Sequence, residues 1–383
     1  MSQNIIYLDH AATTPVDPEV FAAMEPFLKE EFGNPSSLYT LGHDARKAVD
    51  DARAVVARVL NCSAQEVVFT NGGTESANLA VFGVARQAGQ GKVVTSAIEH
   101  PAVLEPCQAL EQEGFEVEVV GVEKNGIIDV SKLADVVDDA TILVSLMAAN
   151  NEIGTIQPVA EAVAAVKEKN SQTVFHSDAC QASGALELDV KKSGVDLLTI
   201  NASKIYGPKG IGALYVKQGL KLKPLMYGGG QERGLCPGTE NVAGIVGLAK
   251  ALELADARQE QESARLTALR DKLTKGILNT IPDTELNGDA KQRLPNNVNI
   301  LIKNIDGQAL LFNLDQQGIQ ASLGSACATG ATEPSHVIMA LGRSGAEAHS
   351  SLRLTLGKDT TEAEIDQVLE SLPTIIQKLR GLK

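Results

Sequence analysis

The sequence predicts an α/β fold in which a mainly parallel sheet lies between layers of helices and a smaller α+β unit follows. Short apolar runs alternate with stretches of helical periodicity from residue 66 to residue 216. Strand and helix in turn imply a parallel sheet that is covered on both faces. A nearly continuous helical pattern then covers residues 239–281. Because so long a helix usually bridges two units, we place a domain boundary near residue 255.

The length and composition agree with two globular domains. At 383 residues the chain exceeds what one small core can organise. Hydrophobic residues make up 44% of the chain and charged residues 21%, as in ordinary globular proteins. We therefore expect a large domain over residues 15–255 and a small domain formed by residues 1–14 and 256–383.

The net charge and the cysteine content argue against some classes of function and indicate the cellular compartment. The net charge of −14 argues against direct binding of nucleic acids or anionic membranes, which both favour a basic face. No apolar run is as long as a membrane span, and the first ten residues carry no secretory signal. The five cysteines are scattered without a CxxC pair, which favours free thiols in a reducing cytoplasm and gives no reason to expect a metal site.

The N-terminal region predicts one short strand and two helices. The apolar start favours a strand, and Pro15 and Pro18 exclude a helix before Asp17. Helices are expected over residues 19–31, where a Gly-Asn-Pro turn follows, and over residues 43–60, where alanine and valine recur at helical spacing.

The middle of the chain predicts the sheet and the helices that cover it. Apolar and β-branched runs predict strands, and the stretches of helical periodicity between them predict helices. The expected strands cover residues 66–70, 92–96, 115–122, 141–147, 173–175, 197–200 and 210–216, and the helices cover residues 74–88, 101–113, 132–137 and 159–169.

The C-terminal region predicts the smaller α+β unit. Strands are expected over residues 298–302 and 351–357, with a helix over residues 308–316 between them. A last helix begins at Thr361, which forms a capping box with Glu364. The N-terminal strand can join this unit.

Two ionisable residues follow neighbouring apolar runs, and the chain is organised around them. Asp178 comes after residues 173–175 and Lys204 after residues 197–200, so both would lie at the sheet edge where parallel strands bind ligands. A buried lysine loses its proton easily and can form a Schiff base, and a buried aspartate can keep a pyridinium nitrogen protonated. Pyridoxal phosphate (PLP) requires that pair of its protein. A buried structural ion pair explains the two residues alone about equally well.

Two further segments at this edge point to a phosphorylated, planar ligand. Residues 71–76 read NGGTES, where Gly73 lets backbone N–H groups approach an anion at a helix start and Thr74 adds a hydroxyl. The ending of a Walker loop is missing, and a plain capped Gly-Gly turn is the alternative. His100 follows the strand at residues 92–96 and can stack on a planar ring and move protons, unless it only packs against a loop.

Cys327 and Arg353 are the candidates for a nucleophile and a carboxylate ligand. Cys327 lies among small residues and glycines in SLGSACATGATEPSH, which predicts an accessible thiol, although thiols in loops are often inert. Arg353 lies in the expected strand SLRLTLG and can hold a carboxylate through paired hydrogen bonds. A surface salt bridge is the alternative for Arg353.

Together these segments closely resemble the cysteine desulfurases of the NifS/IscS type, a group of class V aminotransferase-like enzymes. The resemblance covers nearly the whole chain, and its combination of motifs in this order is highly specific. The motifs are YLDHAATTPVDP, GNPSS, TNGGTESAN, EHPAVL, NNEIGTIQP, HSDACQASG, SKIYGPKGIGALYV, GGGQERG, PGTENV, GSACATG, EPSHVIMALG and SLRLTLG. The resemblance implies the fold-type I architecture of PLP enzymes, with a seven-stranded sheet, and a homodimer with active sites at the subunit interface.

The resemblance also implies the residues that hold the cofactor. Lys204 would be the Schiff-base lysine, Asp178 would pair with the pyridine nitrogen, and Gln181 would hydrogen-bond to the ring oxygen. His100 would stack on the ring and shuttle protons. The other residues implied at the cofactor are Gly73, Thr74, Asn151, Asn201, Ser203 and Thr239 of the partner subunit.

The activity implied is the conversion of L-cysteine to L-alanine. Asn151 and Arg353 would hold the substrate carboxylate, and Cys327 would take the sulfur as a persulfide. The segment around Cys327 resembles the branch of the family with a long, mobile cysteine loop. Such a loop would pass sulfur to an acceptor protein, such as an iron–sulfur cluster scaffold, or toward thiolation of tRNA and cofactors.

Three positions depart from the family's usual pattern. Asn201 and Ser203 stand where the family commonly has serine and histidine before the lysine, so the phosphate would have different donors. Cys236 stands in place of a common arginine, which removes a positive charge, and Tyr39 stands where a histidine is frequent.

The sequence is compatible with three other functions. A selenocysteine lyase would use the same residues, because selenium makes the same attack easier. Another PLP aminotransferase-like enzyme would not need a thiol at Cys327. A catalytically silent PLP-fold scaffold would be favoured by the changes at Asn201, Ser203 and Cys236 and disfavoured by the joint presence of Lys204 and Cys327.

Overall fold

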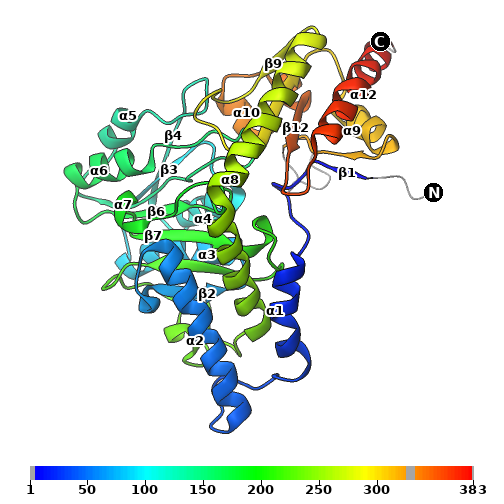
Figure 1. The fold of residues 1–383 in the computed structure, drawn as a ribbon. Helices are drawn as coiled ribbons and strands as arrows, with labels where there is room; N and C mark the ends of the chain where they lie inside the picture. The colour runs from blue at the N-terminus through cyan, green and yellow to red at the C-terminus, as the bar shows by residue number, and fades with distance from the viewer. Residues whose placement is uncertain (1–4, 325–332, 382–383) are drawn as a thin grey trace.

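A seven-stranded sheet forms the centre of the larger part of the molecule (Figure 1). The computed structural model describes residues 5–324 and 333–381. The strand order is β2-β8-β7-β6-β5-β3-β4, and β8 is antiparallel to both of its neighbours while the other pairs are parallel. The prediction of a mainly parallel sheet is therefore confirmed. The strands are β2 (Val67–Thr70), β3 (Lys92–Ser96), β4 (Glu116–Val120), β5 (Thr141–Ser145), β6 (Val174–Asp178), β7 (Leu197–Asn201) and β8 (Gly212–Val216).

Helices cover both faces of this sheet because its strands carry apolar side chains on both sides. On β7, Leu198 and Ile200 pack into one core, whereas Leu197, which directly precedes them, packs into the core on the opposite face. The first core contains side chains of α1 (Pro18–Lys29), α2 (Thr40–Leu60), α5 (Val130–Asp135), α6 (Val159–Lys169), α7 (Val190–Ser193) and the first half of α8 (Val242–Thr280). The second core contains those of α3 (Gly73–Ala88) and α4 (Pro101–Gln112).

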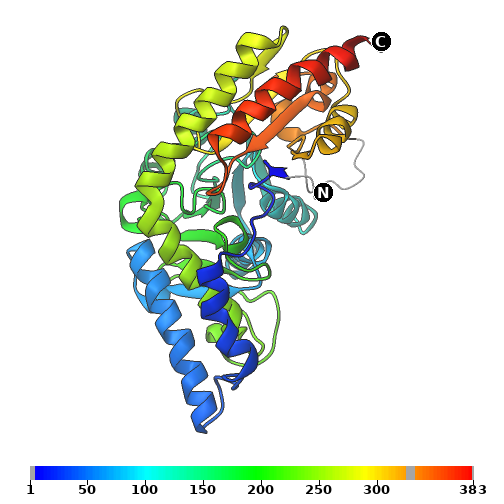
Figure 2. The same cartoon turned by 45° about the vertical axis from the view of Figure 1, so that its right-hand side comes forward.

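Helix α8 extends from the large sheet to a second, smaller group of elements (Figures 1 and 2). Its Leu248 belongs to the core beside the large sheet, whereas its Leu273 and Ile277 belong to a separate core. This third core, which contains Leu273 and Ile277, lies beside the antiparallel sheet β12-β10-β9. The predicted boundary at residue 255 falls inside α8, and the division into two domains there stays a prediction.

The smaller part contains several elements that the sequence did not reveal. Its expected elements are β10 (Asn297–Ile302), α9 (Gly307–Gln316), β12 (Ser351–Thr355) and α12 (Glu362–Gly381). The capping box of Thr361 with Glu364 is confirmed by reciprocal hydrogen bonds. The unexpected elements are β9 (Thr284–Leu286), β11 (Ile319–Gln320), α10 (His336–Ala340) and α11 (Gly345–His349). They have two to five residues, like the unexpected α7, and are too short to show a period.

The N-terminal segment connects the two parts of the molecule. Strand β1 (Ile6–Tyr7) pairs in parallel with β11, and Asp9 forms a bridge with Thr355 at the end of β12. The chain then crosses to the large sheet, where Thr14 hydrogen-bonds to the carbonyl of Ser203. We call residues 8–17 the N-terminal strap. Among the described residues, none of the helices has the length and apolar composition needed to cross a membrane.

Candidate active site

A cavity of about 570 Å³ opens at the carboxyl ends of the parallel strands. Its walls come from the large sheet, the N-terminal strap and the end of the smaller part near β12. This is the sheet edge at which the sequence predicts a ligand site. The predicted site residues that line the cavity are Gly73, Thr74, His100, Asn151, Asp178, Gln181, Asn201, Lys204 and Arg353.

Three predicted site residues are not among those that line this cavity. Ser203 is buried, and its hydroxyl donates a hydrogen bond to Asn201 Oδ1 at 3.2 Å. Thr239 is exposed in the segment before α8, and its role at the site of a partner subunit stays a prediction. Cys327 lies outside the described residues, so its place relative to the cavity stays a prediction.

Lys204 and Asp178 reach the cavity from two adjacent parallel strands. Asp178 is the last residue of β6 and is 8% exposed, and its Oδ1 accepts the backbone N–H of Cys180 at 2.9 Å. Lys204 ends a short 3₁₀ turn after β7, and its Nζ donates to the carbonyl of Ala12 at 2.5 Å. A carboxylate and an amine are therefore held in one cavity by separate backbone contacts.

His100 lies at the start of α4 with its ring oriented by the helix. Its Nδ1 accepts the backbone N–H of Ala102 at 3.0 Å, so the neutral ring carries its proton on Nε2. Burial lowers the pKa of His100, and the charges of Lys204 and His336 lower it further while Asp178 opposes them. The imidazole is therefore mainly neutral at physiological pH and can both accept and donate a proton.

The start of α3 forms a cradle, and Gly73, the first residue of the helix, has no room there for a side chain. Gly72 has φ of 139°, and a Cβ on Gly73 would lie 2.7 Å from Cys180 Sγ. Asn201 Oδ1 accepts from the backbone N–H of Ser203, which leaves Asn201 Nδ2 toward the cradle, 3.4 Å from that same Cβ position. An amide donor and a helix N-terminus thus face one space, which suits an anion.

Arg353 is buried on β12 with part of its hydrogen-bonding capacity unused. It is 2% exposed and is therefore not a surface salt bridge. Its Nη1 donates to the carbonyls of Asn151 and Gly324, and its Nη2 donates to Asp9 Oδ1 at 2.8 Å. Its Nε and Asn151 Oδ1 are buried without a partner among the described residues. Buried polar atoms without partners are costly, so this corner of the cavity is suited to a polar ligand group such as a carboxylate.

The structure brings further residues into the cavity that the sequence analysis did not single out. Glu152 accepts a hydrogen bond from the hydroxyl of Ser335 at 2.6 Å, and burial raises the pKa of its carboxyl group. His336 Nε2 lies 2.9 Å from the carbonyl of Glu99. Both lie inside the quoted motifs NNEIGTIQP and EPSHVIMALG, but the sequence analysis assigned neither of them a role. The lining residues of this kind are Ala11, Ala12, Pro101, Ala102, Glu105, Met147, Ala149, Glu152, Cys180, Gly324 and His336.

Comparisons with known proteins match the chain over nearly its whole length. The family described as "Aminotransferase class-V" matches residues 6–368. A protein named "Cysteine desulfurase IscS" from Dictyoglomus turgidum is 47% identical over 379 residues, which covers 98% of this chain and 96% of that protein. A protein of the same name from Methanosarcina thermophila is 49% identical and covers 98% of this chain and 93% of its own length.

Solved structures agree with these sequence relatives. A structure titled "NIFS-LIKE PROTEIN" has a TM-score of 0.93 and 38% sequence identity, and the match covers 98% of this chain and all of that one. Another, titled "SspA in complex with cysteine", has a TM-score of 0.81 and 35% identity, and covers 92% of this chain and 98% of its own. The expected fold-type I architecture is confirmed by the first of these matches together with the seven-stranded sheet.

Proposed function

The chain belongs to the class-V aminotransferase family, and from that premise we propose that it is a PLP-dependent cysteine desulfurase. It would convert L-cysteine to L-alanine and keep the sulfur as a persulfide on Cys327. The observation that carries this proposal is the meeting of Lys204, Asp178, His100 and Arg353 in one cavity. An amine, a carboxylate, a neutral imidazole and a buried guanidinium are the groups that this reaction needs from its protein.

The residues of the cavity fit the parts of PLP. Gly73, Thr74 and Asn201 would hold the phosphate at the start of α3, where a helix N-terminus and an amide donor converge. Asp178 would hold the pyridine nitrogen and Lys204 the aldehyde carbon. When bound, PLP supplies an electron sink for the bonds at the substrate Cα.

Two more residues fit the ring of PLP. The ring of His100 would lie on the face of the cofactor, as its fixed position at the start of α4 permits. Gln181 donates to the carbonyl of Ala11 in this structure and would turn its amide to the ring oxygen. Thr239 of the partner subunit would add a hydroxyl at the phosphate.

The substrate would be oriented by its carboxylate. Arg353 Nε and Asn151 Oδ1 are both buried without a partner in the described part of the chain, and Arg353 Nη1 donates to the backbone carbonyl of Asn151. Rotation of that amide would present its N–H group, so the two side chains together could receive both oxygens of a carboxylate. This contact would place the substrate Cα beside Lys204.

Different side chains would then carry out the separate steps of the reaction. Lys204 Nζ, held near the cavity by the carbonyl of Ala12, would take the proton from the substrate Cα. Cys327, as a thiolate, would attack the substrate sulfur, so that the C–S bond breaks and an S–S bond forms. His100 would carry protons between the substrate and the other side chains, since burial lowers its pKa and leaves the imidazole neutral with one nitrogen to accept and one to donate. The balance is L-cysteine plus a thiol giving L-alanine plus a persulfide, so the step needs no external oxidant.

An assay of the protein loaded with PLP tests this function. With L-cysteine and excess dithiothreitol, we expect alanine and sulfide in equal amounts and a change in the cofactor absorption on adding substrate. A selenocysteine lyase would release alanine from L-selenocysteine and not from L-cysteine. An aminotransferase would give a keto acid instead of alanine. A silent scaffold would show a cofactor band that does not respond to cysteine.

The sulfur would leave through a protein partner in the cytoplasm. The persulfide on Cys327 would pass to an acceptor such as an iron–sulfur cluster scaffold, or toward thiolation of tRNA and cofactors. Free cysteines at positions 62, 107, 180 and 236 agree with a reducing compartment. The net charge of −14 disfavours direct contact with nucleic acid.

A homodimer would complete the site, and exposed apolar side chains support it. Large apolar residues on α1 and in the connection to α2 are each more than half exposed, which is more than isolated surface positions explain. This end of the molecule projects away from the sheet in Figure 2. The residues are Phe21, Leu28, Phe32, Leu38 and Tyr39.

We therefore expect sedimentation equilibrium to give twice the chain mass of 40.3 kDa. Phe32→Asp combined with Leu38→Asp should shift the protein to monomers and weaken PLP binding, because Thr239 of the partner subunit is lost. Phe312→Asp, at an exposed residue on α9, serves as the matched control and should stay dimeric. A wild-type monomer with full affinity for PLP would contradict the proposed assembly.

A further inference from the structure

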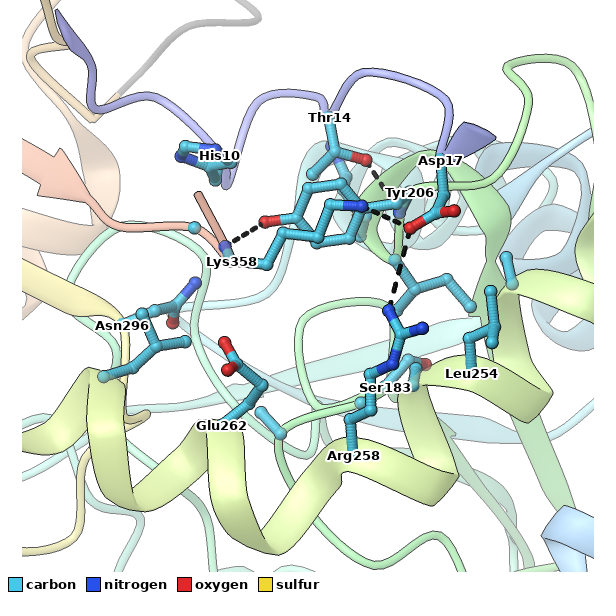
Figure 3. Close-up of a pocket in the computed structure, with 18 of the residues that line it drawn as sticks. His10, Thr14, Asp17, Ser183, Tyr206, Leu254, Arg258, Glu262, Asn296 and Lys358 are labelled. Carbon is cyan, nitrogen blue, oxygen red and sulfur yellow. Dashed lines mark hydrogen bonds and ion pairs between the residues drawn. The ribbon is translucent and has the colours of Figure 1, made fainter. Parts of the chain in front are cut away.

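A second cavity, of about 370 Å³, lies against the turn that carries Lys204 (Figure 3). Lys204 lines this cavity as well as the first one. The other walls are α8, the N-terminal strap and the chain after β12, with Gly357 and Lys358. On this side the turn from Lys204 to Tyr206 therefore borders open space, so packing alone does not fix it.

The backbone of this turn is strained at Tyr206. Tyr206 has φ of 63°, in the left-handed region that residues with a Cβ rarely adopt. Such a conformation persists only where surrounding contacts hold it. Its N–H donates to Thr14 Oγ1 at 2.8 Å, and its carbonyl accepts the N–H of Asp17 at 2.9 Å. Both partners belong to the N-terminal strap.

The smaller part of the molecule holds the side chain of the same tyrosine. The backbone N–H of Lys358 donates to the Tyr206 hydroxyl at 2.7 Å. The Lys358 ammonium lies 4.8 Å from the centroid of the Tyr206 ring and forms an ion pair with Asp17 Oδ2. Figure 3 shows the lysine side chain crossing the tyrosine ring to reach this carboxylate. We call Tyr206, Lys358 and Asp17 the clamp.

Burial and close packing support the clamp. The side chain of Asp17 is only 7% exposed, and the hydrogen bonds from Lys358 and the Glu19 N–H outweigh its burial and lower its pKa. A Cβ on Gly357 would lie 2.5 Å from the Tyr206 hydroxyl, so no other residue fits there without moving the ring. The tyrosine is thus held against the chain that directly follows β12.

We propose that Lys358 is a positioning residue for Lys204, acting through Tyr206 and Asp17. Strand β12 carries Arg353 and leads within five residues to Lys358, whereas Tyr206 lies two residues after Lys204. The clamp therefore fixes the distance between the group that would bind the substrate carboxylate and the amine that would take the α-proton. This inference rests on the proposed function for its activity readout.

Two substitutions and a conservative variant test the clamp in the PLP-loaded protein. Lys358→Met keeps the length of the side chain and removes its charge, and Tyr206→Phe keeps the ring and removes the hydroxyl. Each should lower kcat for alanine formation by about 10- to 100-fold, the scale of a misplaced catalytic group. The absorption of PLP bonded to Lys204 changes with pH, and each substitution should also shift the pH midpoint of that change. Lys358→Arg should restore both values toward wild type.

Matched variants separate positioning from a loss of folding. Arg258 Nη1 also approaches Asp17, at 3.8 Å, and Nη2 pairs with Glu19 at 2.7 Å, so Arg258→Met is the control that should keep wild-type kcat and pH midpoint. The double variant Lys358→Met/Tyr206→Phe removes two different contacts that hold the same turn, so its loss of kcat should be smaller than the product of the two single losses. If the Lys358→Met variant does not fold, the kcat and the pH midpoint of the Tyr206→Phe variant test the clamp by themselves.

The outcomes distinguish failure of the clamp from failure of the proposed function. Wild-type kcat and an unmoved pH midpoint in both single variants would overturn the clamp. A wild-type protein that bonds PLP at Lys204, as borohydride reduction and peptide mass would show, but makes no alanine would overturn the proposed function. In that case the pH midpoint of the absorption of PLP bonded to Lys204 still tests the clamp in the variants.

Discussion

Replacing Cys327 with alanine is expected to abolish persulfide formation while cofactor binding is retained. The residue would be the sole acceptor of the substrate sulfur, so its loss should lower alanine formation from L-cysteine by about 10³-fold or more, as for removal of a covalent nucleophile. The change in cofactor absorption on adding L-cysteine should persist, because Arg353, Asn151 and Lys204 are unchanged. Single-turnover measurement of alanine, with absorption recorded in parallel, separates the two effects.

The other cysteines provide the internal control for this prediction. Burial raises the pKa of Cys62, Cys107 and Cys236 to about 12 and that of Cys180 well above its usual range. Since only the thiolate is a strong nucleophile, these four thiols should react very slowly at pH 7.5 and faster only as the pH rises.

Iodoacetamide labelling read by peptide mass checks the order of reactivity. At pH 7.5 we expect label on Cys327 first. If Cys327→Ala makes alanine at the wild-type rate, sulfur leaves by elimination or through another thiol. Cys180, which lines the cavity, would then be the next residue to replace.

Replacing Lys204 with alanine should remove both the covalent attachment of PLP and the base at the substrate Cα. We expect turnover to fall by up to about 10⁴-fold, the upper range for a positioned acid–base group. The wild-type protein treated with PLP and borohydride should carry the added mass on the peptide that contains Lys204, and the variant should carry none there. The two losses should appear together because one Nζ atom serves both roles.

Lys209→Ala is the matched control for this experiment. Lys209 belongs to the same SKIYGPK segment, is exposed, and donates its Nζ to the carbonyl of Thr14 at 2.8 Å. It should keep both the modified Lys204 peptide and the wild-type rate. Undiminished turnover in Lys204→Ala, or borohydride-fixed PLP on Lys209 in the wild type, would contradict the assignment.

The fold class and the centre of the site could be predicted from local patterns. The expected strand at residues 92–96 and helix at residues 159–169 agree with β3 and α6 at both ends. Asp178 and Lys204 follow apolar runs that pair in parallel as β6 and β7, and this pairing brings them to one cavity. The order of motifs led to the family, which the comparisons confirm.

Other features depend on contacts between distant segments. The reversed direction of β8 is not visible in its apolar run, because parallel and antiparallel strands can carry the same residues. Asp9 and Arg353 form an ion pair across 344 positions of sequence. His336 enters the cavity although it lies 17 residues before the nearest predicted site residue of the smaller part in the described chain, Arg353.

The sequence by itself therefore determined the alternation of strands and helices and the family, and it predicted the chemistry of Lys204 and Asp178. These depend on side-chain type and on spacing along a few residues, which burial of a strand or helix face imposes locally. The tertiary structure alone decided that Arg353 Nε has no partner within residues 5–324 and 333–381, and it decided the strained turn at Tyr206 and its contact with Lys358. Hydrogen bonds and ion pairs of this kind form only after folding brings the N-terminal strap, β7 and β12 together, and no local pattern encodes that meeting.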